Sequence, residues 1–336
     1  MSKSLLENKG KPLSTQNEKK EKMDQKIENL PGVGAATAEK LREAGYTNLM
    51  GLAVASPGEL TEAAGIGEAV ARKIINTARN RLDMGFESGA DLLKKREQIK
   101  RISTGSKNFD ELLGGGFETG SISETFGEFG ASKSQIAHVL AVRAQLPVDK
   151  GGMGENTGVV FLDGESTFRP ERIIQIAKGN GLDPEKVLKN IKVARCLNSD
   201  HQMLVAEKVE DLLKEGKFGL IIVDSLTAHF RADFTGRGML SDRQQRLNRH
   251  MHTLMRLAYH YDTCVYVTNQ VMAKPDMFFG DPTAAIGGNI VAHNSQTRIY
   301  LRKGKKGSRV AKLIDSPWRP DGECIFMVTE KGLEDV

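Results

Sequence analysis

Residues 127–134 constrain the fold of this chain more than any other stretch, and they read Gly-Glu-Phe-Gly-Ala-Ser-Lys-Ser. Alternating apolar residues over 121–126 predict a strand before them, and apolar residues at helical spacing over 136–144 predict a helix after them. A Gly-rich turn between a strand and a helix that opens on Lys-Ser is the context of a P-loop. In such a turn, successive backbone N–H groups and the helix N-terminus present partial positive charge to a triphosphate.

This motif predicts a nucleotide site, although the sequence departs from the motif at one position. We expect Lys133 to reach the terminal phosphates and the Ser134 hydroxyl to hold Mg²⁺. Ser132 stands where the motif has glycine, so its side chain would crowd the phosphate, or strain the turn if a positive φ is needed there. The alternative is a Gly-rich turn without a ligand. The residues expected to bind the nucleotide are Gly127, Glu128, Phe129, Gly130, Ala131, Ser132, Lys133, Ser134 and Gln135.

Composition indicates a soluble globular protein of about two domains. The chain has 336 residues, of which 39% are hydrophobic and 27% are charged. No apolar run approaches the roughly 20 residues that cross a membrane, and the Lys-rich N-terminus does not read as a secretory signal. The three cysteines match no metal-ligand spacing and are typical of reduced thiols, so we expect a cytoplasmic protein. A net charge of +5 permits a polyanionic partner without demanding one.

Four segments follow one another along the chain. Residues 1–26 are polar and predict a disordered tail, and residues 27–80 predict a small helical domain. Residues 81–97 predict a linker, and residues 98–336 predict an α/β domain. Phe86 is an isolated hydrophobe in the linker, which either docks into a neighbour's pocket or caps the core of its own domain.

The small helical domain contains an internal near-repeat. Gly32-Val33-Gly34 and Gly65-Ile66-Gly67 each lead into an apolar-periodic helix. This arrangement resembles the helix-hairpin-helix motif, in which turn amides bind a nucleic-acid phosphate without reading sequence. The alternative is a protein-interaction module whose glycines only make tight corners. The basic residues that would add contacts to DNA are Lys40, Arg42, Arg72 and Lys73.

Residues 98–336 alternate short apolar runs with helical segments, which predicts a mostly parallel, buried sheet. The buried strands are expected at 159–162, 220–223 and 265–267, and the helices at 133–146, 170–181, 202–216 and 241–260. After residue 296, apolar runs flank the basic turn 303–307 and predict a hairpin, and residues 321–330 predict one more strand. We therefore expect antiparallel strands at one edge of the sheet.

Three of the expected strands end in residues that suit ATP chemistry. Asp224 follows one strand as a Walker B carboxylate, and Glu165 follows another as a general base for water. Gln270 follows the third, where its amide would orient water or bond the γ-phosphate. Each alone is compatible with an ordinary solvated or capping side chain. Their convergence with the P-loop at the carboxyl edge of the sheet is far more specific.

A series of short motifs runs through the chain in a fixed order, and together they resemble the archaeal RadA recombinases of the RecA superfamily. The resemblance covers about nine-tenths of the chain, from residue 27 to the end. It implies a RecA-like P-loop ATPase core and excludes a hexameric helicase. The motifs are Leu30–Gly34, Arg101–Ser106, Leu112–Gly116, Thr167–Arg172, Phe234–Gly238, Arg243–Gln245, Ala273–Asp276 and Phe278–Gly280.

The resemblance implies that ATP and Mg²⁺ bind between neighbouring protomers. Arg172 is then expected to stack on the adenine, and Pro320 of the adjacent protomer to cover its other face. Gln270 is expected to sense the γ-phosphate and relay its presence to the loop that follows. Asp315 and Asp321 lie where family members bind a cation at the interface, with K⁺ as a candidate.

The resemblance also implies assembly on DNA. Two DNA-binding loops are expected at 231–243 and about 271–288. Phe86 and Gly89 match the polymerisation motif F-x-x-[AG], which favours docking of Phe86 on a neighbouring protomer. The implied partners are single-stranded and double-stranded DNA, further copies in a helical filament or ring, and recombination mediators. The expected contacts to the DNA backbone are Arg231, Arg237 and Arg243.

Three departures from the family cluster around the phosphate site. They are Ser132, Gly164 in place of a commoner threonine beside Glu165, and Asn289 in place of a histidine that couples nucleotide to loop conformation. We expect a DNA-dependent ATPase that forms filaments on single-stranded DNA and catalyses homologous pairing and strand exchange. The alternative is a RadA-like paralogue that binds DNA or a recombinase partner with weak or absent hydrolysis. A nucleotide-binding structural filament fits less well, because it leaves the arginine-bearing loops without a purpose.

Overall fold

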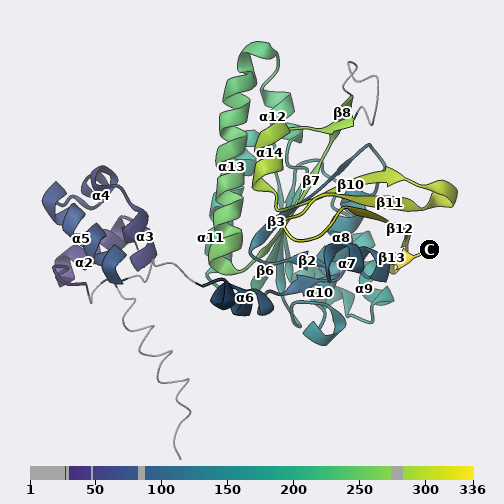
Figure 1. Cartoon of the computed structure of the whole chain (residues 1–336), viewed down its shortest axis with the longest axis horizontal. Helices are drawn as coiled ribbons and strands as arrows, with labels where there is room; N and C mark the ends of the chain where they lie inside the picture. The colour runs from purple at the N-terminus through teal and green to yellow at the C-terminus, as the bar shows by residue number, and fades with distance from the viewer. Residues whose placement is uncertain (1–26, 28–29, 47, 82–87, 274–282) are drawn as a thin grey trace, which may run out of the picture. The chain divides into compact units, whose positions relative to one another are not determined.

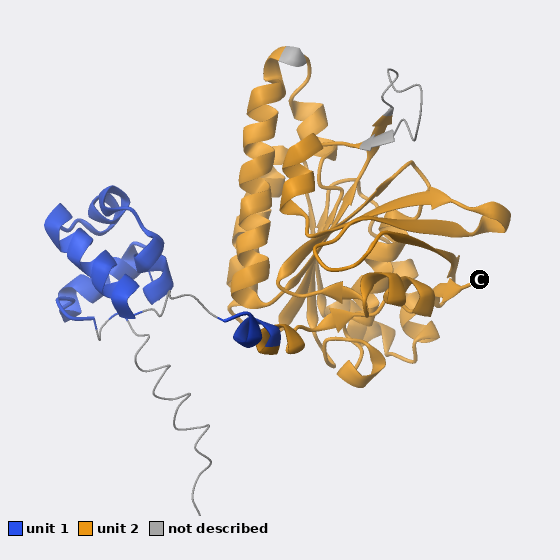
Figure 2. Cartoon of the chain, viewed as in Figure 1, with its two compact units in different colours: residues 1–93 blue, residues 94–336 orange. Residues whose placement is uncertain are grey.

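The computed structural model describes residues 27, 30–46, 48–81, 88–273 and 283–336. The chain divides into two compact units, residues 1–93 and residues 94–336, which Figure 2 colours separately. Within the described ranges, we find no helix with both the length and the apolar character to cross a bilayer.

The first unit is helical, as the sequence predicts. Ser56 and Glu59 form a capping box that starts α4, and Gly65 ends that helix in the left-handed conformation, with φ of +60°. The second Gly-x-Gly turn thus joins α4 to α5. Apolar side chains from α2, α3, α4 and α5 form one core around Leu41, Leu52 and Ile74. The helices are α2 (Ala35–Glu43), α3 (Leu49–Val54), α4 (Pro57–Ala64) and α5 (Glu68–Arg81), and α6 (Gly89–Glu97) follows.

The second unit alternates strands and helices (Figure 1). Its strands are β1 (Arg101–Ile102), β2 (Phe117–Glu118), β3 (Ser121–Gly127), β4 (Gly158–Asp163), β5 (Ile191–Arg195), β6 (Phe218–Asp224), β7 (Cys264–Asn269), β8 (Val271–Ala273), β9 (Thr283–Ala285), β10 (Thr297–Lys303), β11 (Arg309–Asp315), β12 (Gly322–Thr329) and β13 (Gly332–Asp335). Its helices are α7 (Lys107–Leu113), α8 (Lys133–Arg143), α9 (Pro170–Gly179), α10 (Pro184–Lys189), α11 (Ser199–Leu213), α12 (Ala228–Asp233), α13 (Leu240–Tyr261) and α14 (Gly288–Asn294), with 3₁₀ turns at Val148–Lys150, Arg237–Met239 and Lys305–Gly307.

The main sheet has nine strands in the order β13-β12-β11-β10-β3-β7-β6-β4-β5. The pairs from β10 through β3, β7, β6 and β4 to β5 are parallel, and the pairs from β10 to β13 are antiparallel. The prediction of a mostly parallel sheet with an antiparallel edge is confirmed. Each parallel strand therefore ends at the same edge of the sheet as the glycine-rich turn after β3.

Residues of the central strands alternate between two cores, one on each face of the sheet. Phe161 and Ile222 pack on the face covered by α7, α8, α9 and α10, and Leu162 and Val223 pack on the face covered by α11, α13 and α14 (Figure 1). Both faces are buried, which is why these strands read as continuous apolar runs in the sequence.

The sequence does not predict several of the elements, because they are short. They are α7, α10 and α14, the strands β5 and β13, and the two-stranded β8–β9 hairpin. The hairpin falls inside the second expected DNA loop, and the end of α12 with the first turn of α13 falls inside the first. Part of each expected loop therefore has regular structure.

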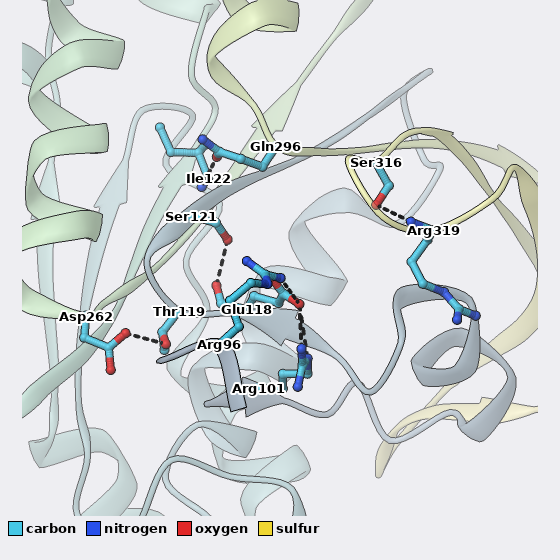
Figure 3. A network of polar contacts seen from close by, with 10 residues as sticks. All are labelled: Arg96, Arg101, Glu118, Thr119, Ser121, Ile122, Asp262, Gln296, Ser316 and Arg319. Atoms are coloured by element: carbon cyan, nitrogen blue, oxygen red, sulfur yellow. Dashed lines mark hydrogen bonds and ion pairs between the residues drawn. The ribbon is translucent and has the colours of Figure 1, made fainter. Parts of the chain in front are cut away.

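Polar contacts fix the start of β3 (Figure 3). The Glu118 carboxylate accepts hydrogen bonds from Arg96 and Arg101, with the Arg101 Nη2–Oε1 distance at 2.8 Å. The Ile122 amide donates to the Gln296 side chain at 2.7 Å, which ties β3 to the residue just before β10. These contacts fix the position of the start of β3 relative to β10.

A fully buried carboxylate lies in the middle of β3. Glu124 accepts a hydrogen bond from Arg298 Nε of β10 at 2.7 Å and another from Asn269 Nδ2 of β7 at 2.7 Å. Glu124 therefore links the two strands that flank β3.

Replacing Glu124 with alanine should destabilise the second unit by about 3 kcal/mol, because the mostly buried Arg298 charge would lose its partner. Urea unfolding followed by circular dichroism measures the loss. The double change Glu124→Leu with Arg298→Leu is the control, and we expect it to be milder because no unpaired charge remains. A cost below about 1 kcal/mol for the single variant would contradict this role.

Candidate nucleotide-binding site

A cavity of about 560 Å³ lies at the carboxyl edge of the parallel strands. It brings together nearly all of the residues predicted from the P-loop and the strand ends. Ala131 is the exception in the P-loop, since its side chain is buried in the core beneath the turn. The predicted residues that line the cavity are Gly127, Glu128, Phe129, Gly130, Ser132, Lys133, Ser134, Gln135, Glu165, Asp224 and Gln270.

The backbone of the loop needs glycine where it passes closest to the sheet. A Cβ atom on Gly127 would lie 2.2 Å from the carbonyl oxygen of Leu301 on the neighbouring strand β10. Gly130 has a φ of +78°, a conformation that glycine adopts without strain. The loop can therefore turn sharply from β3 into α8, whose N-terminus faces the cavity.

Ser132 lies in the left-handed conformation, with φ of +81°, as the N-cap of α8. The turn therefore does need a positive φ at the one position where the motif has glycine and this chain does not. The Ser132 side chain gains a partner there, because its Oγ accepts a hydrogen bond from Arg309 Nε at 2.8 Å. Arg309 begins β11 and itself lines the cavity.

The Lys133 ammonium group folds back over the loop. Its Nζ donates to the carbonyl oxygens of Gly127, at 2.7 Å, and Glu128, at 2.9 Å. Burial lowers the pKa of Lys133, and the nearby carboxylates of Asp224 and Glu165 oppose that shift. Lys133 thus supplies a partly desolvated positive charge at the base of the cavity.

Asp224 ends β6 as a buried carboxylate. Thr268 donates a hydrogen bond to one of its oxygens, and Thr167 donates to the other at 2.9 Å. Oxygen donors such as Asp224 and the Ser134 hydroxyl suit Mg²⁺, which binds proteins through one or two side chains together with substrate phosphates. In the described parts of the chain no cluster of three or more His, Cys, Asp or Glu side chains forms a metal site, and Mg²⁺ bound beside a phosphate needs none.

Glu165, Gln270 and Arg231 form a hydrogen-bonded chain at the rim of the cavity. Gln270 Nε2 donates to Glu165 Oε1 at 2.7 Å, and Arg231 Nη1 donates to Gln270 Oε1 at 3.3 Å. Glu165 follows β4, Gln270 follows β7, and Arg231 lies on α12 in the first expected DNA loop. The predicted base and sensor are therefore in contact with each other and with a predicted DNA-binding arginine.

His138 connects α8 to the segment that carries Glu165. One ring nitrogen, Nδ1, lies 2.6 Å from the Ser134 carbonyl oxygen, and the other, Nε2, accepts a hydrogen bond from the Arg169 amide at 3.0 Å. A neutral ring with its proton on Nδ1 satisfies both contacts. Burial lowers the pKa of His138, which favours this neutral form.

Arg172 lies beside the cavity, on α9. Its Nε donates to Gln135 Oε1 at 2.8 Å, and its Nη2 donates to the carbonyl oxygen of Thr329 at 2.6 Å. The predicted adenine contact is thus held between a cavity-lining residue and the end of β12.

Pro320 and Asp321 line a different cavity, of about 660 Å³, between α7 and the start of β12. This second cavity shares no lining residue with the first. Asp315 ends β11 and is exposed. Within one chain, these three residues are therefore not part of the P-loop cavity.

The remaining predicted residues are spread over several elements. Arg243 lies on the first turn of α13, and Asn289 is exposed on the first turn of α14. The side chain of Arg237 and the whole of Phe86 lie outside the described residues, while Gly89 begins α6. At Gly164, a Cβ atom would lie 3.3 Å from the Ser225 carbonyl oxygen and 3.4 Å from His229 Cδ2, so a side chain there would pack directly against these two residues.

Sequence reasoning misses Thr167, Thr268, His138 and Arg309. Thr268 lies near the end of β7 and Thr167 lies two residues after Glu165, so their closeness in sequence to Gln270 and Glu165 was a usable signal. Arg309 lies 177 residues from Ser132 and only the strand pairing brings it to the loop.

Comparison with family models gives two matches. A model described as Rad51 matches residues 95–336, and a model described as a SAM-like helix-hairpin-helix tandem matches residues 24–80. The first covers the unit with the cavity, and the second covers the unit with the paired Gly-x-Gly turns. Both agree with the RecA-like fold class and the helix-hairpin-helix assignment.

Two substitutions at position 132 should separate backbone strain from side-chain bonding. Ser132→Ala keeps the left-handed strain and loses the hydroxyl, whereas Ser132→Gly loses the hydroxyl and relieves the strain. We expect the glycine variant to be more stable than the alanine variant by about 1 kcal/mol. Urea unfolding without nucleotide measures the difference, and equal stabilities would show that the turn is not strained at Ser132.

Proposed function

The chain belongs to the Rad51 family, and we propose that it is an ATP-dependent recombinase that assembles on single-stranded DNA and pairs it with a homologous duplex. The family assignment supports a role in DNA recombination and repair. Within the family, the motifs resemble those of the archaeal RadA proteins, so we propose that type.

One observation supports the proposal in addition to family membership. The hydrogen-bonded chain from Glu165 through Gln270 to Arg231 joins a cavity suited to phosphates with an arginine of the first expected DNA loop. A phosphate that draws the Gln270 amide away from Glu165 would also release Arg231. ATP binding and DNA binding then change the same three side chains, which is the coupling that a DNA-dependent ATPase requires.

In the proposed hydrolysis of ATP, the residues around the cavity have separate roles. Lys133 and the N-terminus of α8 bind the phosphates, and the Glu165 carboxylate accepts a proton from the attacking water. Gln270 orients that water or the γ-phosphate. Ser134 and Asp224 would hold Mg²⁺, which supplies positive charge to neutralise the phosphates when bound.

We propose that a second protomer completes the site. Pro320, Asp315 and Asp321 lie away from the P-loop cavity of their own chain, which supports their use at a neighbour's nucleotide. A cation such as K⁺ would bind beside the two carboxylates there.

In the first unit, we propose that the turn amides bind a DNA phosphate with the help of Lys73. Lys73 lies close to Gly32, with its Cε 3.7 Å from where a Cβ atom on that glycine would be, so its positive charge lies beside the turn.

The second candidate is a RadA-like paralogue that binds DNA or a recombinase partner and hydrolyses ATP poorly. The left-handed Ser132 favours it, because this departure lies in the phosphate loop itself. Measurement of ATP turnover with and without single-stranded DNA distinguishes the two functions.

ATP turnover should rise when single-stranded DNA is added to the native chain. Glu165→Gln should lower that turnover by about a hundredfold or more while DNA binding persists, because the general base is lost. Glu185→Gln, an equivalent change at an exposed position of α10, is the control and should leave turnover unchanged. Native protein that binds DNA without turnover, and gains turnover as Ser132→Gly, would favour the paralogue.

Filaments on single-stranded DNA should be lost in Phe86→Ala, with the chain still folded. The reason is that assembly would then lack its apolar anchor in the neighbouring protomer. Electron microscopy detects the filaments, and circular dichroism checks the fold. Val54→Ala removes an exposed apolar side chain from the same unit and should leave filaments intact. Persistent Phe86→Ala filaments would refute the assignment.

A further inference from the structure

The β10–β11 hairpin places two positive side chains against the phosphate loop. Arg309, at the start of β11, is half-buried, lines the cavity and donates to Ser132 Oγ at 2.8 Å. Lys303, at the end of β10, lies over Gly130, since a Cβ atom on that glycine would be 3.2 Å from Lys303 Nζ. With Lys133 of α8, three cations from three elements lie around one turn.

The guanidinium of Arg309 is held by three contacts. Its Nε donates to Ser132, and its Nη1 donates to the carbonyl oxygens of Gly307, at 2.7 Å, and Ser308, at 2.9 Å. In the described part of the chain its other amine, Nη2, makes no hydrogen bond. The plane of the group is therefore fixed at the wall of the cavity, while one N–H₂ remains to bind an anion.

We propose that Arg309 binds the phosphate chain of the nucleotide and that the Ser132 hydroxyl positions it for this contact. The inference rests on the proposed function in one respect, that this cavity takes a nucleotide. A guanidinium held in advance loses little side-chain entropy on binding, and charge-assisted hydrogen bonds to phosphate are among the strong ones.

The same pair explains why serine is tolerated in the left-handed position. Glycine there would relieve the strain but would remove the acceptor that holds Arg309 Nε. Serine at position 132 thus strains the backbone, and its hydroxyl in return positions the Arg309 cation. Positions 132 and 309 then act as one unit, although 177 residues separate them.

Equilibrium binding of a fluorescent ATP analogue, without DNA, tests the contact. Arg309→Gln should weaken binding by about tenfold, the size expected for one lost hydrogen bond between charged groups. Arg309→Lys should recover part of the loss, because the charge returns without the planar fork. Arg302→Gln removes the same charge from the same hairpin, away from the cavity lining, and should bind like the native chain.

A double-mutant cycle tests the role of Ser132. Ser132→Ala removes the hydroxyl and keeps the Cβ, so the backbone strain is the same in both members of the pair. We expect Arg309→Gln to weaken binding by only about threefold in the Ser132→Ala background, because Arg309 is no longer positioned. Equal penalties in both backgrounds would overturn the positioning role.

The outcomes separate this inference from the function on which it rests. Unchanged affinity in Arg309→Gln, with binding lost in Lys133→Ala, would overturn the Arg309 contact and leave the nucleotide site standing. Absence of binding by the native chain would overturn the proposed function itself. Unfolding curves without nucleotide show whether each variant is folded. An affinity loss in Arg309→Gln that Arg309→Lys does not reduce at all would also overturn the contact, since a purely structural guanidinium gives that result.

Discussion

The buried carboxylate of Glu124 is the contact on which the arrangement of the site depends. It holds Arg298 of β10 on one side and the Asn269 amide of β7 on the other, so it binds together the three strands around the phosphate loop. Asn269 extends this network. Its Nδ2 also donates to the Ile286 carbonyl oxygen at 2.6 Å, and its Oδ1 accepts from Thr227 at 2.6 Å. A charge buried without such partners would be costly, so the three strands have little freedom to shift past one another.

Through Asn269, the same network reaches the bases of both expected DNA loops. Thr227 precedes α12 and Ile286 precedes α14. Gln270, the next residue along the chain, carries the contact to Glu165. The cavity and the two expected loops are therefore anchored to the same buried residue of the sheet, and the proposed change in side-chain bonding at Gln270 requires no displacement of the strands beneath it.

Local patterns predicted most of the fold and much of the site, and the rest depended on pairing between distant segments. The P-loop, Asp224, Glu165 and Gln270 were predictable because each follows an apolar strand and parallel strands end at a common edge. Nothing near Ser132 in the sequence points to Arg309, because their contact exists only once β10 pairs in parallel with β3 and β11 turns back. Pro320 could be named only by resemblance, since its expected partner is on another protomer.

The segment between Gln270 and Ile286 leaves the sheet and returns to the same point. The Ile286 amide donates to the Gln270 carbonyl oxygen at 3.0 Å, and the Ile286 carbonyl accepts from Asn269, so both ends are tied to the end of β7. A loop closed in this way can gain or lose residues at small entropic cost and without moving its base. A change in the length of this segment would therefore leave Asn269 and Gln270 in place beside the cavity.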